Sequence, residues 1–422
     1  MLKKQNSEFS FTEIENNLKN KPFYTLFFTL VILSLFFIQA LRLYMPGVYV
    51  AMFHVVFYED IIENFLILIT LIFFTLPGLT NTISKKVGNK RLQMFSIYTI
   101  AISRLIIAFH LPNIWQTIFA GILIAFYGMF ISTFLTLWVK DEKIEISISN
   151  KMIFVVFSIL CAFLLDYLIR TIGFSQDISL LPPGVVAEFW YITQYIWLFI
   201  QIPLTVCCIY FTRLYFPRFV SLSNLEEHGE IDTKSTGYSL IFAGIGVIWF
   251  LLFNVFLYPN IIAIYTGTNY YFNNFLSIIA LIVAILIMVC VKKKYIFNIQ
   301  VLAILNVLLI VFLSFFLFIG RIITYLAVIM IAISLVIIYL DFFLLFVQMA
   351  TVKFKWEKVK TISNAFTIGL IFYILFSVLH IFTTDWAYVI SAFKGFGPFI
   401  VLLACSLLVI SILISTQINQ KR

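Results

Sequence analysis

The chain has 422 residues, of which 63% are hydrophobic and 11% charged, and its mean hydropathy is +1.07. A water-soluble core cannot account for so much apolar sequence, so lipid must solvate a large part of it. The net charge of +9 does not indicate a nucleic-acid-binding protein, because the basic residues lie in short segments between apolar runs and not on one soluble face.

Apolar runs of roughly 20 residues, the length of one bilayer crossing, predict twelve transmembrane helices. Their approximate ranges are 23–44, 60–79, 92–110, 114–138, 151–171, 188–212, 238–258, 272–291, 297–319, 322–348, 362–383 and 397–416. We therefore expect an all-α polytopic membrane protein with two six-helix bundles. The predicted divisions are a cytoplasmic tail at 1–22, the first bundle at 23–212, a cytoplasmic linker at 213–237, the second bundle at 238–416 and a second tail at 417–422.

The basic residues predict the orientation of these helices. They precede the first span, follow the second, fourth, sixth, eighth and tenth spans, and end the chain. The exceptions among the 28 Lys and Arg are Arg42, Arg104, Arg170, Arg321 and Lys394. Because cytoplasmic loops carry an excess of Lys and Arg, the pattern predicts a multi-pass protein of the cell membrane with both termini in the cytoplasm.

The segment after the second span is a short basic hairpin that reads GLTNTISKKVGNKR from Gly78 to Arg91. Its last part resembles the signature loop between the second and third helices of the major facilitator superfamily of transporters. In that family the pattern is Gly-x-x-x-Asp-x-x-Gly followed by basic residues. Lys86, Gly88, Lys90 and Arg91 match it, whereas Asn81 replaces the first Gly and Lys85 replaces the acid.

The resemblance implies a fold of six plus six helices and a gating role for this hairpin, whose residues are Lys85, Lys86, Gly88, Lys90 and Arg91. The charge reversal at Lys85 puts the usual gating contact in doubt, since the family's acid holds neighbouring helix ends together in one state. The family's proton-coupling residues cannot be transferred, because the first span contains no acid.

Arg104 is the deepest basic residue in the predicted spans. It lies about 18 Å along its helix from Leu92, slightly past the midplane of a hydrocarbon core roughly 30 Å thick. A charge at that depth needs a partner, a wet cavity or a path to the interface. Two interpretations stay open: Arg104 binds an anionic or polar substrate, or it pairs with an acid on a neighbouring helix.

Other polar residues inside the spans supply further candidates. Gln194 and Asn254 are candidates for helix-packing hydrogen bonds and for substrate contacts. Glu63, near the outer end of the second span, and Asp341, about two turns from the cytoplasmic end of the tenth, are candidates for ion coupling. Asp341 has an alternative role as the partner of a snorkelling lysine.

The leading interpretation is a secondary active or facilitative transporter of a small polar or anionic solute that works by alternating access. Coupling of solute movement to a proton is one form of this interpretation. We find no P-loop, GxGxxG or metal-ligand spacing, so we expect no nucleotide, no metal or other cofactor and no catalytic residues. The partners that we expect are the lipid bilayer and the solute, and not a nucleic acid. One alternative is a membrane-embedded enzyme acting on lipid or lipid-linked substrates at the outer leaflet, using Glu59, Asp60, Glu63, Asp166 and Arg321. Another is a non-transporting scaffold or sensor with a transporter-like fold.

Overall fold

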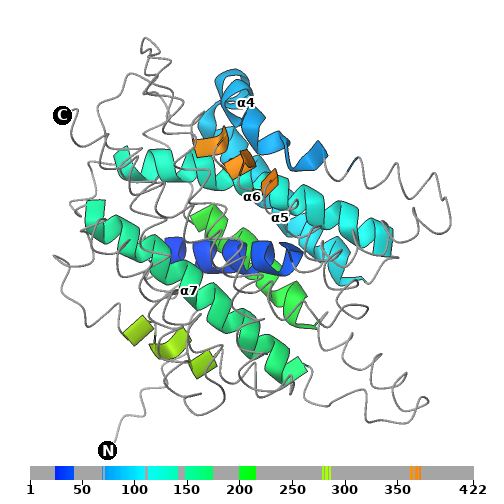
Figure 1. Ribbon diagram of the computed structural model, residues 1–422, viewed down its shortest axis with the longest axis vertical. Helices are drawn as coiled ribbons and strands as arrows, with labels where there is room; N and C mark the ends of the chain where they lie inside the picture. Colours follow the sequence, from blue (N-terminus) through cyan, green and yellow to red (C-terminus); the bar gives the residue numbers. More distant parts are fainter. Residues whose placement is uncertain are drawn as a thin grey trace, which may run out of the picture.

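The computed structural model describes residues 24–41, 69, 72–109, 113–140, 148–173 and 199–214, together with short pieces at 278–279, 281–283, 285–286, 362–364, 366–368 and 370–371. All of the elements in this part of the chain are helical. Three of the helices in it are long and apolar enough to cross a membrane, namely Tyr24–Leu41, Asn89–Ala108 and Trp115–Leu135. The described part therefore centres on the predicted first bundle, and Figure 1 shows its helices stacked side by side.

The predicted basic hairpin is almost entirely helical. A 3-10 turn, η1 (Leu76–Leu79), leads into α4 (Thr80–Val87), and α5 (Asn89–Ala108) begins after Gly88 alone. Gly88 has φ 88° and ψ 143°, a backbone conformation that is essentially restricted to glycine. The prediction of a loop between spans ending at 79 and beginning at 92 was wrong, because a single glycine suffices to turn the chain.

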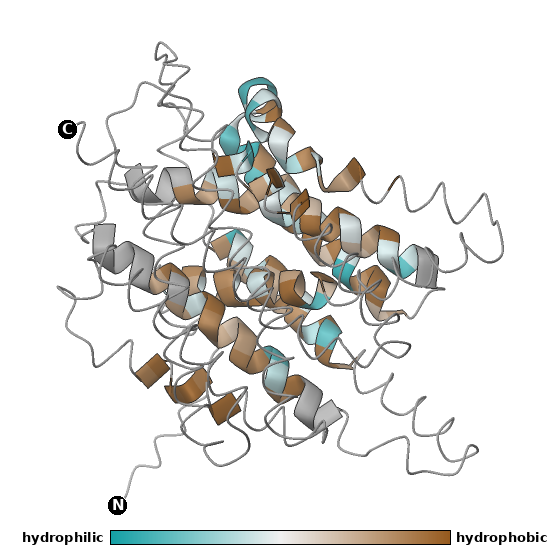
Figure 2. Cartoon of the chain, viewed as in Figure 1, coloured by the Kyte–Doolittle hydropathy of each residue, from teal (hydrophilic) through white to brown (hydrophobic). Residues whose placement is uncertain are grey.

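The charges of this segment explain why α4 extends so far. Lys85 and Lys86 lie in its last turn, where positive charge interacts favourably with the helix macrodipole. Figure 2 shows that hydrophilic residues gather at α4, whereas the remaining described helices are mostly hydrophobic. We call this side of the molecule, marked by Lys85 to Arg91, the basic end.

The helices Tyr24–Leu41 and Trp115–Leu135 are largely surrounded by protein, whereas α5 is more exposed and lies on the outside. In Tyr24–Leu41 and Trp115–Leu135, 83% of the apolar window is buried, compared with 56% in α5. Trp115–Leu135 belongs to α6 (Asn113–Lys140), which packs along α5, and α7 (Ile148–Gly173) contacts α6. The shorter helix Phe199–Leu214 lies near Tyr24–Leu41 in Figure 1.

The outer helices are apolar on the outside and polar on the inside. Phe95 and Ile102 of α5 and Phe109, its C-cap residue, are 59%, 55% and 60% exposed and recur every seven residues. The opposite face buries four polar residues, Gln93, Ser96, Ser103 and Arg104. This arrangement is the reverse of a soluble amphipathic helix and fits a helix that is solvated by lipid.

Helix Phe199–Leu214 repeats this pattern. Gln201, Thr205, Cys208 and Thr212 are spaced three or four residues apart and are all buried, while Phe199 is 75% exposed. Polar side chains on both outer helices thus point toward the interior of the bundle, where they can bond to each other and to Tyr24–Leu41.

Pieces of the second half flank the first-half helices on two sides. In Figure 1 the pieces within 362–371 lie beside α4 and α6, and those within 278–286 lie at the opposite side of the drawing, beyond α7. Ile362, Phe366 and Leu370, four residues apart, are at most 4% exposed. One face of that helical segment is therefore fully covered.

Candidate functional site

A polar network crosses the bundle at Arg104, whose side chain is 0% exposed. The Arg104 Nε group donates a hydrogen bond of 3.1 Å to Oε1 of Gln201, on Phe199–Leu214. Gln201 Nε2 in turn donates a bond of 3.4 Å to Oε1 of Gln39, on Tyr24–Leu41. A single amide side chain therefore links three helices.

A carboxylate on a fourth helix supplies the opposite charge. Asp166, on α7, is 1% exposed and interacts electrostatically with Arg104. Removing both charges from water is costly, so their attraction and the surrounding hydrogen bonds must stabilise them in the bundle. We refer to Gln39, Arg104, Asp166 and Gln201 together as the polar network.

The network lies far from the basic end. Arg104 is about 22 Å along α5 from Asn89, at 1.5 Å per residue. Gln39 also has an Nε2 group that is buried and has no hydrogen-bond partner among the described residues. A buried donor of this kind needs an acceptor, and a polar ligand beside Gln39 would supply one.

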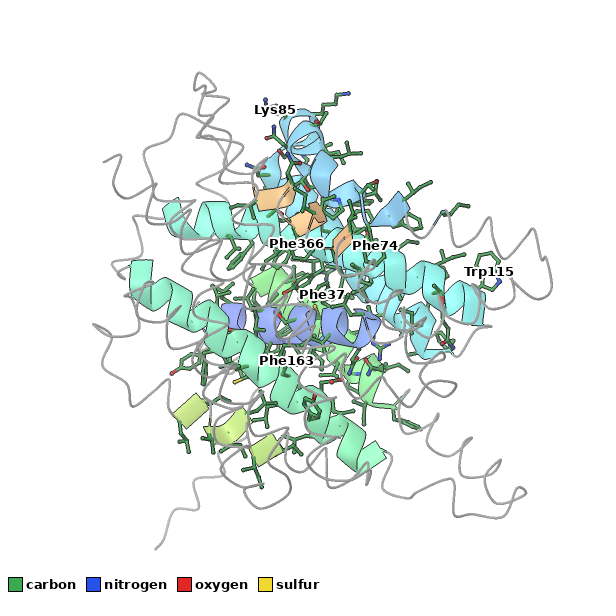
Figure 3. All side chains as sticks on the ribbon, in the orientation of Figure 1. Phe37, Phe74, Lys85, Trp115, Phe163 and Phe366 are labelled. Carbon is green, nitrogen blue, oxygen red and sulfur yellow. The ribbon has the colours of Figure 1, made fainter. Side chains whose placement is uncertain are left out.

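An aromatic cluster lies next to the network on the same central helix. Phe37 stacks on Tyr127 of α6 with ring centroids 4.2 Å apart and an interplanar angle of 14°. The Tyr127 hydroxyl and Ser34 Oγ share a hydrogen bond of 3.0 Å. The ring of Phe366 is 6.0 Å from that of Phe37 and 6.4 Å from that of Tyr127, and Figure 3 shows Phe366 and Phe37 near the centre of the molecule.

Some of the site residues predicted from the sequence lie within the ranges that the structure describes, and others do not. The gating residues Lys85, Lys86, Gly88, Lys90 and Arg91 all lie around the turn between α4 and α5, and Lys85 extends outward at the edge of the drawing in Figure 3. Arg104 lies in the polar network. Gln194, Asn254, Glu63 and Asp341 lie outside the described residues, as do Glu59, Asp60 and Arg321 of the enzyme alternative.

The structure brings together residues that sequence reasoning had not connected. From the sequence, Asp166 was a candidate for the enzyme alternative, and its interaction with Arg104 was not predicted. Gln39 was not singled out, although an amide within an apolar span is itself a signal. Gly128 was also overlooked, and an isolated glycine inside a predicted helix often marks a close approach of another chain segment.

The comparisons with known proteins concern the fold alone. No family's sequence profile matches the chain, and no curated protein matches it in sequence. Solved structures do match. The proton:xylose symporter XylE bound to 6-bromo-6-deoxy-D-glucose has a TM-score of 0.59 and 12% identity, covering 94% of this chain and 96% of its own.

Two further structures agree with this match. The E. coli fucose:proton symporter FucP has a TM-score of 0.60 and 13% identity, with 93% of this chain and 98% of its own covered. The human organic anion transporter MFSD10 has a TM-score of 0.58 and 11% identity, with 95% and 99% covered. The chain therefore has the fold of the major facilitator superfamily and is a multi-pass helical membrane protein, as the sequence predicted.

Proposed function

We propose that this protein is a secondary transporter that moves a small polar or anionic solute by alternating access. The observation that carries the proposal is a charged and amide-rich network buried across four helices of a bundle with the major-facilitator fold. Ionisable groups inside a membrane domain are costly and commonly mark solute or ion pathways. The similar structures, two proton symporters and an organic anion transporter, support the same class of function.

Arg104 is the proposed substrate residue within the described part of the chain. Its guanidinium is a planar group of N–H donors that suits an anionic or polar solute, and its Nε group donates to Gln201. Asp166 offsets part of its positive charge, which favours a neutral polar solute or one with a single negative charge. Gln39, with its buried Nε2 donor, is a second candidate contact.

The remaining assignments rest on the sequence. Gln194 and Asn254 are proposed substrate contacts, and Glu63 and Asp341 are the proposed ion-coupling residues. The hairpin from Lys85 to Arg91 is the proposed gating element, at the side that the basic residues assign to the cytoplasm.

A thermal-shift screen tests the proposal directly. Purified protein in detergent is heated with a panel of sugars, organic anions, amino acids and nucleosides, and a bound solute raises the unfolding temperature. Each hit is then tested for uptake into proteoliposomes, with and without a proton gradient. If no solute gives both a shift and an uptake signal, the transport proposal is wrong for this panel of chemistries.

Variants of α5 decide which role Arg104 has. If it binds the solute, Arg104→Gln abolishes the thermal shift, and Arg104→Lys restores part of it. Gln93→Leu is the matched control, because Gln93 is buried on the same face of α5. If Arg104 has only a structural role, Arg104→Gln still shows the solute-induced thermal shift, although its unfolding temperature without solute is lower.

A further inference from the structure

Within the described residues, Phe366 of the second half packs closely against Gly128 of α6. A methyl group on Gly128 would lie 2.8 Å from Cδ1 of Phe366, 2.9 Å from its Cε1 and 2.8 Å from Cγ of Pro77. These distances are shorter than real side-chain contacts allow. The Phe366 ring therefore occupies a notch that exists only because residue 128 has no side chain.

The notch has walls from three first-half elements. Pro77 belongs to η1 and is buried, Gly128 and Tyr127 belong to α6, and Phe37 belongs to Tyr24–Leu41. Phe366 itself is 4% exposed. One aromatic ring from the second half thus contacts three helical elements of the first.

A second contact lies beside the notch. A Cβ atom on Gly78 would lie 3.4 Å from Thr367 Oγ1, 3.5 Å from Asn364 Oδ1 and 3.9 Å from Thr367 Cβ. Gly78 belongs to η1, which leads into α4 with Lys85 and Lys86 in its last turn, so these contacts lie on the side of the bundle nearer the basic end.

We propose that Phe366, seated in the notch of Pro77, Tyr127 and Gly128, is the latch that closes the two halves at the basic end and must leave the notch whenever that end opens. This inference rests on the proposed alternating-access function. Close packing favours two discrete states, one with the Phe366 ring in the notch and one with the ring outside it. A ring that moves out of such a tight site loses all of its packing contacts there at once. The neighbouring Gly78 and Thr367 then separate together with the latch.

A disulfide between Gly78→Cys and Thr367→Cys tests whether the contact must open. The Cβ separation of 3.9 Å lies within the range of about 3.5–4.5 Å found in disulfides. The background replaces Cys161, Cys207, Cys208, Cys290 and Cys405 by alanine. The control pair is Gly78→Cys with Ile371→Cys, because Ile371 is 38% exposed on the same helical segment and should not cross-link.

Labelling of the single cysteine in Gly78→Cys measures opening without any solute. Gly78 is half-buried, and a bulky maleimide in detergent should react faster there once Thr367 and Asn364 have moved away. Gly128→Ala pushes the ring out of the notch, and we expect the labelling rate to rise about tenfold. Phe366→Ala removes the ring without adding volume and should act in the same direction, while Thr133→Ala, five residues away on α6, serves as the unaffected control.

The outcomes separate the latch from the transport function. Efficient cross-linking that stops solute uptake until the disulfide is reduced, together with faster labelling of Gly128→Ala and Phe366→Ala, supports the latch. Uptake that continues undiminished in the cross-linked protein overturns it and leaves transport intact. The latch is also overturned if the labelling rate at Gly78→Cys is the same with Gly128→Ala, Phe366→Ala and Thr133→Ala, provided that each variant elutes as monodisperse protein. If the unlinked protein moves no solute while the labelling still responds, the transport proposal fails and the latch survives.

Discussion

The polar network and the notch of Phe366 are both buried, yet different forces hold them together. The network joins four helices of the first half through charge and two amide hydrogen bonds, at 3.1 and 3.4 Å. The notch joins the first half to the second through ring packing against a glycine and a proline. Polar bonds are directional and tie helices within one unit, whereas apolar packing can release and re-form without leaving a charge unpaired.

The helix Tyr24–Leu41 takes part in both regions. Gln39 bonds to the polar network, while Phe37 and Ser34 contact the aromatic cluster. A small movement of this helix therefore changes both regions at once. This helix therefore physically connects the proposed substrate residues with the proposed latch.

The largest expected effect comes from Asp166→Asn. The substitution leaves the Arg104 guanidinium buried without its carboxylate, which should cost about 3–5 kcal/mol of unfolding free energy. Arg104→Gln should cost a similar amount, and the double variant should lose much less than the sum of the two. Denaturant unfolding in detergent measures all three. Additive losses would show that Arg104 and Asp166 do not interact. Charge pairing would then not be a force that holds the polar network together.

Gly128→Ala should have the next largest effect. Its methyl group overlaps Phe366 and Pro77, so we expect a loss of about 1–3 kcal/mol from the closed arrangement. Gly78→Ala is the matched control, since its methyl group meets Thr367 and Asn364 at ordinary contact distances of 3.4 and 3.5 Å, and we expect a change within about 0.5 kcal/mol. Thermal unfolding of the two variants side by side provides the measurement. Equal effects would mean that the notch is not tight.

Gln201→Leu tests the hydrogen-bonding part of the network separately from its charge. The change removes both amide bonds and leaves Arg104 and Asp166 in place. Hydrogen bonds between membrane helices contribute about 0.6 kcal/mol each and at most about 1.7, so we expect a loss near 1 kcal/mol in the same unfolding experiment. A loss as large as that of Asp166→Asn would show that Gln201 also positions the charged pair.

Tyr127→Phe should have the smallest effect and sharpens the description of the aromatic cluster. It removes the hydroxyl that bonds to Ser34 at 3.0 Å and keeps the stack on Phe37. We expect a loss of about 0.6 kcal/mol, and a larger loss for Tyr127→Leu, which also removes the ring. If Tyr127→Phe destabilises as much as Tyr127→Leu, the hydrogen bond and not the stack holds this cluster.

The sequence by itself determined the class of fold. Long apolar runs predict membrane helices because backbone groups in lipid must bond within their own segment, and the basic residues mark one end of the bundle. It also identified Arg104 as a buried charge in need of a partner, since its position along the helix follows from a fixed rise per residue.

Tertiary structure alone decided which residues meet. Asp166 and Gln201 reach Arg104 from helices far away in sequence, and Phe366 enters a notch formed by Pro77, Tyr127 and Gly128. Hydrophobicity shows that a helix lies in the membrane, but lipid and protein interior are equally apolar, so it does not show which face meets which neighbour. That choice depends on side-chain shape and polar pairing across the assembled bundle.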